Sequence, residues 1–466
     1  MTESDVHDEY FDTTDLRLAG RGIALYRRTG GGDEGWHLEL DRTGPQRRRT
    51  EPLGTAESPP SAIAEAVQAY QRGRPLEPVA RVRTSRRTSP LIGSGGRVVA
   101  EVSDDHIWTE PLVGDGASDA WREWRIEVAD GPPEVGEALR HAFAGTKPDR
   151  GLSHLARALG AEMPDQQATR PRPKDRAAGA FLDYAEAQVD ALLELDPLVR
   201  EDAPDSVHRM RVACRRLRSA LSTYRVSVGK ERGKGLRDEL RWLGQILGRV
   251  RDAEVMRERL EDLVRAEPAD LVMGPVDVTL AEDLGAEYHQ GSAALAEALA
   301  SDRYFSLLDA LEALADDLAA RRGTKGGKSE KLTVEQLTKR DARRLTAAVQ
   351  AAAVARGTDD ADRHLHEARK AAKKLRYAAE SASAFGAKTA RRIEKRSHRV
   401  QQVLGDHQDS VVTAELLRRL AVEAYGRGEN AFSYGRLHAH EQHLAEAAEA
   451  QFYRLRDKLP GSLGGS

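Results

Sequence analysis

Cysteine is nearly absent from this chain of 466 residues, since Cys214 is the only one. A single thiol forms no intramolecular disulfide and no cysteine metal cluster, which excludes a disulfide-stapled domain and a zinc finger. No run of about eighteen apolar residues occurs, which excludes a membrane-spanning helix. The N-terminus MTESDVHDEYFD has neither the basic nor the apolar segment of a leader peptide. These absences predict a soluble, cytoplasmic protein in which Cys214 is a small core residue.

Aromatic residues are scarce as well, at 5% of the chain, whereas charged residues make up 32%. This composition favours helices rich in Ala, Leu, Arg and Glu. The 72 Lys and Arg residues are balanced by 75 Asp and Glu residues, so the formal net charge is −3. A chain without a basic excess is not expected to adhere generally to nucleic acid, and any anion site must be local. The length suits about two or three domains.

The stretch Ser206–Arg225, SVHRMRVACRRLRSALSTYR, predicts an amphipathic helix whose polar stripe is entirely basic. At about 100° per residue one face carries four cationic or titratable side chains. These are His208, Arg211, Arg215 and Arg218. A solvated helix face normally mixes signs, because like charges at i,i+4 repel. The stripe therefore indicates an external anion, with a solvated basic face as the alternative when this helix is considered alone.

A second copy of the pattern begins at His364, where the chain reads HLHEARKAAKKLRYAAE. With His366 at the position of His208, three cationic residues repeat the stripe: Arg369, Lys373 and Arg376. Each copy is followed by the same Leu-Gly-x-x-x-Asp signature, which ends at Asp252 in the first and at Asp409 in the second. The recurrence in register indicates an internal duplication and strengthens the prediction of an anion-binding surface.

These residues resemble the CHAD domain, the conserved-histidine α-helical domain. The resemblance rests on H-x-x-R-x-x-x-[RK]-[RK]-x-R followed by LG-x-x-x-D, twice, and covers residues from about 177 to 458. It implies two four-helix bundles about a pseudo-two-fold axis, with a shared basic groove that binds inorganic polyphosphate. We assign residues 177–460 to this all-α domain, with repeats at about 177–322 and 331–458. The predicted helices are Ala177–Arg200, Pro204–Val226, Glu231–Ala266, Ala281–Arg322, Thr333–Arg356, Asp359–Ala384, Ala387–Ala424 and Glu429–Lys458.

The expected polyphosphate ligands combine arginines, which bind phosphate through a planar fork, with lysines, which act as point charges. The set is His208, Arg211, Arg215, Arg216, Arg218, His366, Arg369, Lys370, Lys373, Lys374, Arg376 and Arg399. The two histidines are expected either to orient an arginine as neutral rings or to add charge as imidazolium. Asp252 and Asp409 are expected to hold arginines in place, with simple cap or turn residues as the alternative. This domain is expected to need no cofactor.

Residues 1–160 read differently, because short β-type runs alternate with turn signals. A glycine-rich break between Gly22–Arg28 and Trp36–Leu40 predicts a hairpin. Further strands are predicted at Val79–Ser89, Arg97–Val102, His106–Pro111 and Trp121–Val128, and helices at Ser61–Gln71 and Pro133–Ala144. The pattern predicts an α+β domain with an antiparallel, barrel-like sheet. Residues 161–176 have the proline and polar content of a linker.

Several of these segments resemble the CYTH domain, the fold of the triphosphate tunnel enzymes. They are Glu9–Thr13 and the strands ALYRR, WHLEL, ARVRTSRR and WREWRIEV. The resemblance implies a triphosphate site at Arg28, Arg81, Arg83 and Arg86, and Mg²⁺ or Mn²⁺ ligands at Glu101, Glu123 and Glu127. Hard carboxylate oxygens suit these hard cations. The family's opening Glu-x-Glu-x-Lys strand is missing, so the domain is expected to lack its first strand and to bind metal poorly.

Three functions follow as hypotheses. The leading one is non-catalytic polyphosphate binding in the cytoplasm, associated with polyphosphate granules. The alternative is a metal-dependent triphosphate or polyphosphate hydrolase of the inorganic triphosphatase type, acting through the CYTH-like domain. Nucleic-acid binding is the third; the basic helices argue against it, because Tyr224 and Tyr377 are their only aromatic residues for base stacking. No membrane partner is expected.

Overall fold

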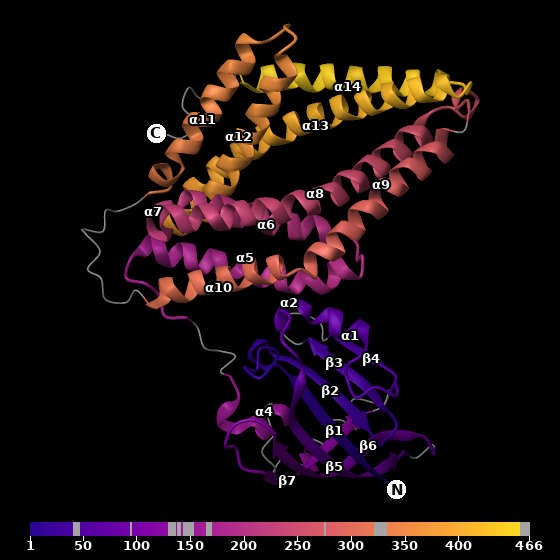
Figure 1. Ribbon diagram of the computed structural model, residues 1–466, viewed down its shortest axis with the longest axis vertical. Coiled ribbons are helices and arrows are strands. Elements are labelled where there is room, and N and C mark those ends of the chain that lie inside the picture. Colours follow the sequence, from indigo (N-terminus) through magenta and orange to yellow (C-terminus); the bar gives the residue numbers. More distant parts are fainter. Residues whose placement is uncertain are drawn as a thin grey trace. The chain divides into compact units, whose positions relative to one another are not determined.

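The computed structural model describes residues 1–40, 47–93, 96–128, 137, 141–142, 153–164, 170–274, 276–320 and 333–456. The chain divides into two compact units, Met1–Thr169 and Arg170–Ser466 (Figure 1). The division falls inside the segment predicted as a linker. Within the described ranges, no helix combines the length and the apolar character needed to span a bilayer.

The first unit contains a seven-stranded antiparallel sheet, in the order β4-β3-β2-β1-β5-β6-β7. The strands are β1 Thr2–Asp12, β2 Ile23–Thr29, β3 Gly35–Leu40, β4 Arg47–Glu51, β5 Glu77–Ile92, β6 Val98–Pro111 and β7 Asp119–Val128. The helices are α1 Ser61–Ala66, α2 Gln68–Gln71 and α4 His154–Leu159. Tyr10, Val82 and Leu155 belong to the hydrophobic core that α4 forms with the sheet. The predicted antiparallel, barrel-like sheet fits this architecture.

The strand predictions need three corrections. Strands β1 and β4 were not predicted. The segments predicted as two strands at 97–102 and 106–111 form the single strand β6, because the acidic residues between them do not make a turn. Instead, Asp105 is fully buried and its carboxylate accepts two hydrogen bonds from Arg86 of β5. Most of the helix predicted at Pro133–Ala144 lies outside the described residues.

The second unit is helical, as predicted. Its helices are α5 Arg176–Arg200, α6 Ser206–Thr223, α7 Arg225–Val228, α8 Lys230–Ala266, α9 Val276–Leu299, α10 Asp302–Ala320, α11 Val334–Val354, α12 Ala361–Ser381, α13 Ala387–Gly426 and α14 Phe432–Arg456. The prediction of a single helix at Ala281–Arg322 is wrong, because the helix is interrupted between α9 and α10. Ser301 occupies this break, where its hydroxyl donates to Ala298 O and accepts from Tyr304 N. A serine before an acidic residue is a helix-start signal, and the prediction of a single helix did not take it into account.

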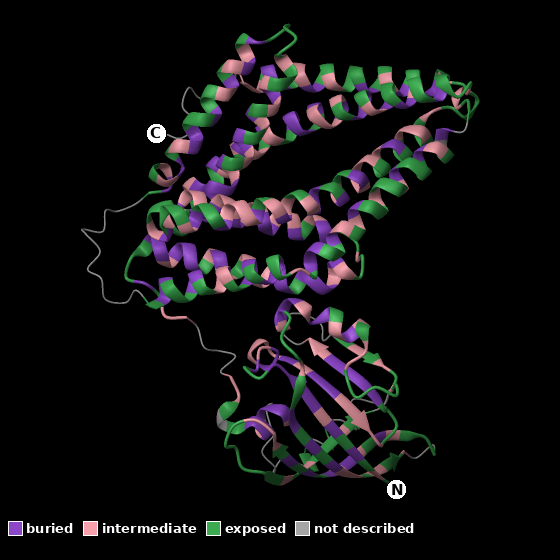
Figure 2. Ribbon diagram, viewed as in Figure 1, coloured by how far each residue is buried: buried purple, intermediate pink, exposed green. Residues whose placement is uncertain are grey.

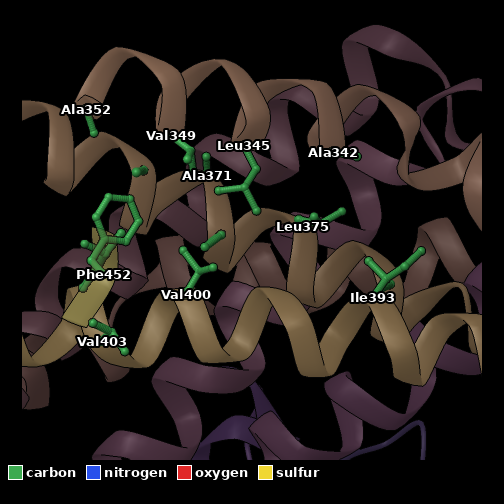
Figure 3. Close-up of a cluster of buried hydrophobic side chains, with 14 of the residues drawn as sticks. Ala342, Leu345, Val349, Ala352, Ala371, Leu375, Ile393, Val400, Val403 and Phe452 are labelled. Atoms are coloured by element: carbon green, nitrogen blue, oxygen red, sulfur yellow. The ribbon is translucent and has the colours of Figure 1, made fainter. Parts of the chain in front are cut away.

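Apolar packing fixes which side of each basic helix is turned outward. In the second half of the unit, Leu345 of α11, Leu375 of α12 and Val400 of α13 share one core with Phe452 of α14 (Figure 3). Each such side chain contributes about 1.5–3 kcal/mol when fully buried. Buried residues also recur along α6 (Figure 2). Cys214 is among them and is fully enclosed, as predicted. The cationic residues of both helices therefore lie on the side away from these cores.

Candidate anion-binding site

The two predicted basic helices, α6 and α12, pack against each other. Their C-terminal ends are joined by a hydrogen bond in which Tyr224 Oη donates to Ser381 O at 2.7 Å. A further hydrogen bond joins α11 to α6, because Arg340 Nη2 donates to Ser222 Oγ at 2.7 Å. The sequence predicted each stripe, and the structure brings the two helices that carry them together.

The first Leu-Gly-x-x-x-Asp signature lies on α8 and supports Arg211 of α6. Arg211 Nη1 donates to Asp252 Oδ1 at 2.8 Å. The guanidinium also lies over Gly248, where an added Cβ atom would be 3.3 Å from Arg211 Nη2. The glycine thus leaves room for the arginine against the helix backbone, and the aspartate one turn later fixes its direction.

The second signature repeats this arrangement on α13. Arg369 Nη2 donates to Asp409 Oδ1 at 3.2 Å, and a Cβ atom on Gly405 would be 3.6 Å from the same nitrogen. Both aspartates therefore have the arginine partners that were predicted for them, while their part in ligand binding stays a prediction. The role of the glycines was missed. Its signal was a helix-interior glycine at two equivalent positions, where alanine is about 1 kcal/mol more favourable.

The stripes converge at Lys373, which is half-buried on α12. Burial lowers the pKa of Lys373 to about 7, aided by the positive charges of three arginines, Arg369 on the same helix and Arg215 and Arg211 on α6. Burial likewise lowers the pKa of Arg215. We refer to Arg211, Arg215, Arg369 and Lys373 as the basic cluster. Buried cations are normally paired with acids, so a group in which cations outnumber carboxylates marks a candidate anion site.

The two histidines flank the basic cluster. Burial lowers the pKa of His208, and the charges of Arg251, Arg215 and Arg211 act in the same sense against the opposing effect of Asp205. Burial also lowers the pKa of His366. His366 Nδ1 is buried and has no hydrogen-bond partner among the described residues. Of the two predicted states, these environments favour the neutral ring at neutral pH.

The remaining predicted ligands have other surroundings. Arg216 lies 2.7 Å from Glu380 Oε1, to which Tyr184 Oη also donates, so it links α6 to α12 and does not belong to the basic cluster. Lys370 pairs with Glu367 on its own helix at 2.8 Å. Arg376 donates to Gln401 Oε1 at 3.3 Å, and burial lowers the pKa of Arg218. Lys374 and Arg399 are exposed.

A cavity of about 880 Å³ lies between α8, α9 and α13 and has Asp252 in its wall. Its charged lining is mixed, with Arg249 and Arg419 set against Asp252, Glu287 and Glu415. This balance does not favour an anion, so the cavity is not included in the candidate site.

The predicted triphosphate residues do not form one cationic surface. Arg28 donates two hydrogen bonds of 2.7 Å to the buried carboxylate of Asp8, and Arg86 donates two of 2.8 Å to Asp105. Arg81 and Arg83 lie on the opposite face of β5, because side chains alternate along a strand. Arg81 pairs there with Glu9 at 3.0 Å. The predicted remnant is therefore split between two faces, and Arg28 and Arg86 are already paired with buried acids.

The predicted metal ligands are not brought together either. Glu123 accepts hydrogen bonds from Trp121 Nε1 and His154 Nε2, both at 3.1 Å. Glu101 and Glu127 are exposed neighbours on β6 and β7. Among the described residues, no three His, Cys, Asp or Glu side chains are placed to hold a metal ion. These carboxylates do not fit a Mg²⁺ or Mn²⁺ site, which needs several oxygens around one point.

Comparison with known proteins adds three findings. The family model for the CHAD domain matches residues 183–418, which include both basic helices. Two curated relatives are "Uncharacterized protein MT2285" of Mycobacterium tuberculosis (strain CDC 1551 / Oshkosh) and "Uncharacterized protein Rv2226" of Mycobacterium tuberculosis (strain ATCC 25618 / H37Rv). Each is 37% identical over 468 residues, which span 97% of this chain and 89% of the relative. The CYTH resemblance of the first unit stays a prediction.

Two solved structures are also similar to this chain. The CHAD domain from the plant Ricinus communis is 26% identical with a TM-score of 0.47, covering 64% of this chain and 96% of that one. PptA from Streptomyces chartreusis is 22% identical with a TM-score of 0.47, covering 60% and 99%.

Proposed function

The chain belongs to the CHAD domain family, and on that premise we propose that its helical unit binds inorganic polyphosphate through the basic cluster without acting on it chemically. One observation carries the proposal. The basic helices α6 and α12, one from each copy of the duplicated pattern, pack against each other, and Tyr224 Oη of the first stretch donates to Ser381 O of the second at 2.7 Å. Burial and the charges of arginines on both helices accordingly lower the pKa of Lys373.

Polyphosphate suits this cluster because it is a flexible chain with about one negative charge per phosphate. Two like charges about 5 Å apart repel by roughly 3 kcal/mol at an effective dielectric constant near 20. Repulsion of this kind acts in the free protein, where the arginines of the basic cluster add to the effect of burial in lowering the pKa of Lys373. A bridging polyanion turns it into attraction on both helices at once. Neighbouring phosphates also present their oxygens at the spacing that arginine forks bind.

Asp252 and Asp409 assist this function by holding Arg211 and Arg369 in defined directions. An arginine already held by an acid loses less side-chain freedom when it binds phosphate. Each of these acids is also partly exposed, which weakens its attraction for the arginine and leaves the remaining guanidinium nitrogens for a ligand.

Nucleic acid fits the cluster less well than a polyanion without bases. Tyr224 and Tyr377, the aromatic residues of the two basic stretches, are both buried. Single-strand binding by cationic grooves usually adds base stacking on exposed aromatics, worth about 1–3 kcal/mol per base. The basic cluster would contact only the phosphate groups of a nucleic acid and not its bases, which favours polyphosphate as the ligand.

The hydrolase alternative gains no support from the first unit. Arg28 and Arg86 are paired with buried carboxylates. Of the three predicted metal ligands, only Glu101 and Glu127 are neighbours, and Glu123 already accepts hydrogen bonds from Trp121 and His154. We also propose, as an extension of polyphosphate binding, that the protein resides at cytoplasmic polyphosphate granules.

The test is a titration of the full chain with long-chain polyphosphate at several salt concentrations. We expect log Kd to rise linearly with log salt, with a slope that reflects about four or more neutralised phosphates. Single-stranded DNA is the competitor, at equal phosphate concentration. Displacement of polyphosphate by DNA would contradict the proposed specificity, and a Kd that is independent of salt would contradict the electrostatic mode.

A further inference from the structure

Lys373 differs from its counterpart in the first copy, because the equivalent position there holds Arg215. An arginine stays protonated throughout the accessible pH range, whereas a buried lysine readily loses its proton. α6 and α12 pack against each other, and Lys373 is half-buried on α12, one helical turn after the Arg369 that binds Asp409 of α13. The duplicated pattern therefore places one titratable cation among the arginines of these two packed helices. The other three members of the basic cluster are arginines.

The charged groups that act most strongly on Lys373 lie on α6, α12 and α13. Arg211 and Arg215 face it from α6, Arg369 from its own helix, and Asp409 from α13. Asp409 is already engaged by Arg369, and Asp252 of α8 is engaged by Arg211. A third acid, Asp406 of α13, has its pKa raised by burial and is acted on by Arg259 and Arg369. The two acids that form ion pairs here thus bind arginines, and Lys373 is a cation among cations.

We propose that Lys373 takes up a proton when a polyanion binds the basic cluster, so that the affinity for polyphosphate falls as the pH rises above neutrality. This inference rests on the proposed function and adds a regulatory property to the same site. The phosphates of the ligand supply the acid that Lys373 lacks, so the charged form of the side chain is favoured in the complex.

The direction follows from the lowered pKa of Lys373, about 7 in the free protein. Below pH 7 the amine is already charged and binding needs no proton. Above pH 7 each binding event takes up one proton, and the affinity falls by up to about tenfold per pH unit. The histidines titrate elsewhere, because burial lowers the pKa of both His208 and His366 from the ordinary value. The terminal phosphate groups of the ligand also titrate lower, near pH 6.

The experiment measures the Kd of long-chain polyphosphate for the full chain at pH 6.5, 7.5 and 8.5, at constant ionic strength. For the unaltered protein we expect Kd to rise about five- to tenfold between pH 7.5 and 8.5. Lys373→Arg should bind with a nearly constant Kd over this interval, and Lys373→Met should bind weakly at every pH. Lys339→Arg, an exposed lysine on α11, is the control and should behave as the unaltered protein does.

Calorimetric titration in two buffers of different ionisation enthalpy counts the protons directly. At pH 8.5 we expect uptake of close to one proton by the unaltered protein and almost none by Lys373→Arg. Equal uptake by both, or binding that does not change between pH 7.5 and 8.5, would overturn the role of Lys373 while leaving polyphosphate binding intact. Failure to bind at pH 6.5, where the cluster is fully charged, would refute the proposed function itself.

Discussion

The guanidinium of Arg211 lies against the backbone of Gly248, so closely that a Cβ atom on the glycine would be 3.3 Å from Arg211 Nη2. Gly405 stands in the same relation to Arg369, at 3.6 Å. Both glycines lie in the interior of a long helix, where glycine is costly. Their positions are explained by the arginines that they accommodate and not by the needs of the helix.

The Gly248→Ala substitution should therefore separate stability from binding. Alanine favours the helix by about 0.5–1 kcal/mol, so the free energy of unfolding should stay level or rise. The added methyl group displaces Arg211 from Asp252, and the affinity for polyphosphate should fall by about three- to tenfold. Chemical denaturation and ligand titration measure the two effects.

Gly244→Ala on the same helix is the matched control, because a Cβ atom there would meet nothing within 4 Å. It should stabilise the protein similarly and leave the affinity unchanged. Equal affinities for the two variants would show that Gly248 does not serve Arg211.

The Lys373→Met substitution should stabilise the free protein at low pH. Folding lowers the pKa of Lys373 from 10.5 to about 7. The neutral amine is therefore favoured in the folded state, and stability is lost as the pH falls from the unfolded-state pKa of 10.5 to the folded-state pKa of about 7. Removing the amine should raise the free energy of unfolding by about 1–3 kcal/mol at pH 6 after allowance for solvent screening, and by little at pH 10. Denaturant unfolding at the two pH values measures the difference. If the variant were less stable than the unaltered protein at pH 6, the charged form of Lys373 would not be unfavourable in the folded basic cluster, and the account would be contradicted.

The Asp409→Asn substitution should shift the pH dependence of binding. The Asp409 carboxylate raises the pKa of Lys373 against the larger lowering effects of burial and the arginines. Without it the amine loses its proton at a lower pH, so the rise in Kd should begin below pH 7. The titration series at pH 6.0, 6.5, 7.5 and 8.5 detects this displacement. Asp262→Asn, an exposed position on α8, should leave the curve in place.

The first unit offers a test of whether Arg28 is held by its acidic partners or is available to a ligand. Asp8→Asn removes the buried partner of Arg28, and should cost about 2–4 kcal/mol because the half-buried guanidinium keeps only the exposed Asp33 as an acidic partner. Glu9→Gln breaks the more exposed pair with Arg81 and should cost less than about 0.5 kcal/mol. Thermal and denaturant unfolding of the full chain compares them. Similar small losses from both would indicate that Arg28 is free to bind a ligand.

Helical periodicity made much of the site predictable. It fixes the angular positions of His208, Arg211 and Arg215 once the helix is recognised, and the recurrence at His366 sets the second copy. Periodicity does not account for Arg216, which was predicted as a ligand only because it is an arginine. Arg216 lies off the stripe and pairs with Glu380. Where the two stripes meet depends on the packing of α6 against α12, which no local pattern encodes.

The sheet was harder to predict, because charged residues that pair across strands look like turns in a linear sequence. Asp105 interrupts an apolar run and was assigned to a break, yet it is buried with Arg86 in a continuous strand. The same ambiguity hid β1, in which the buried Asp8 pairs with Arg28 of β2. Period-2 reading along β5 would have separated Arg81 and Arg83 from Arg86.

The most direct test of the account replaces the whole basic cluster. The variant carrying Arg211→Ala, Arg215→Ala, Arg369→Ala and Lys373→Ala is compared with one in which four exposed arginines of the same unit, Arg257, Arg265, Arg418 and Arg427, are replaced by alanine. Both lose the same formal charge, so a general electrostatic attraction weakens equally in both. We predict at least about a 100-fold rise in the Kd of long-chain polyphosphate for the first variant and less than about threefold for the second at moderate salt. Equal affinities for the two variants would contradict binding at the basic cluster.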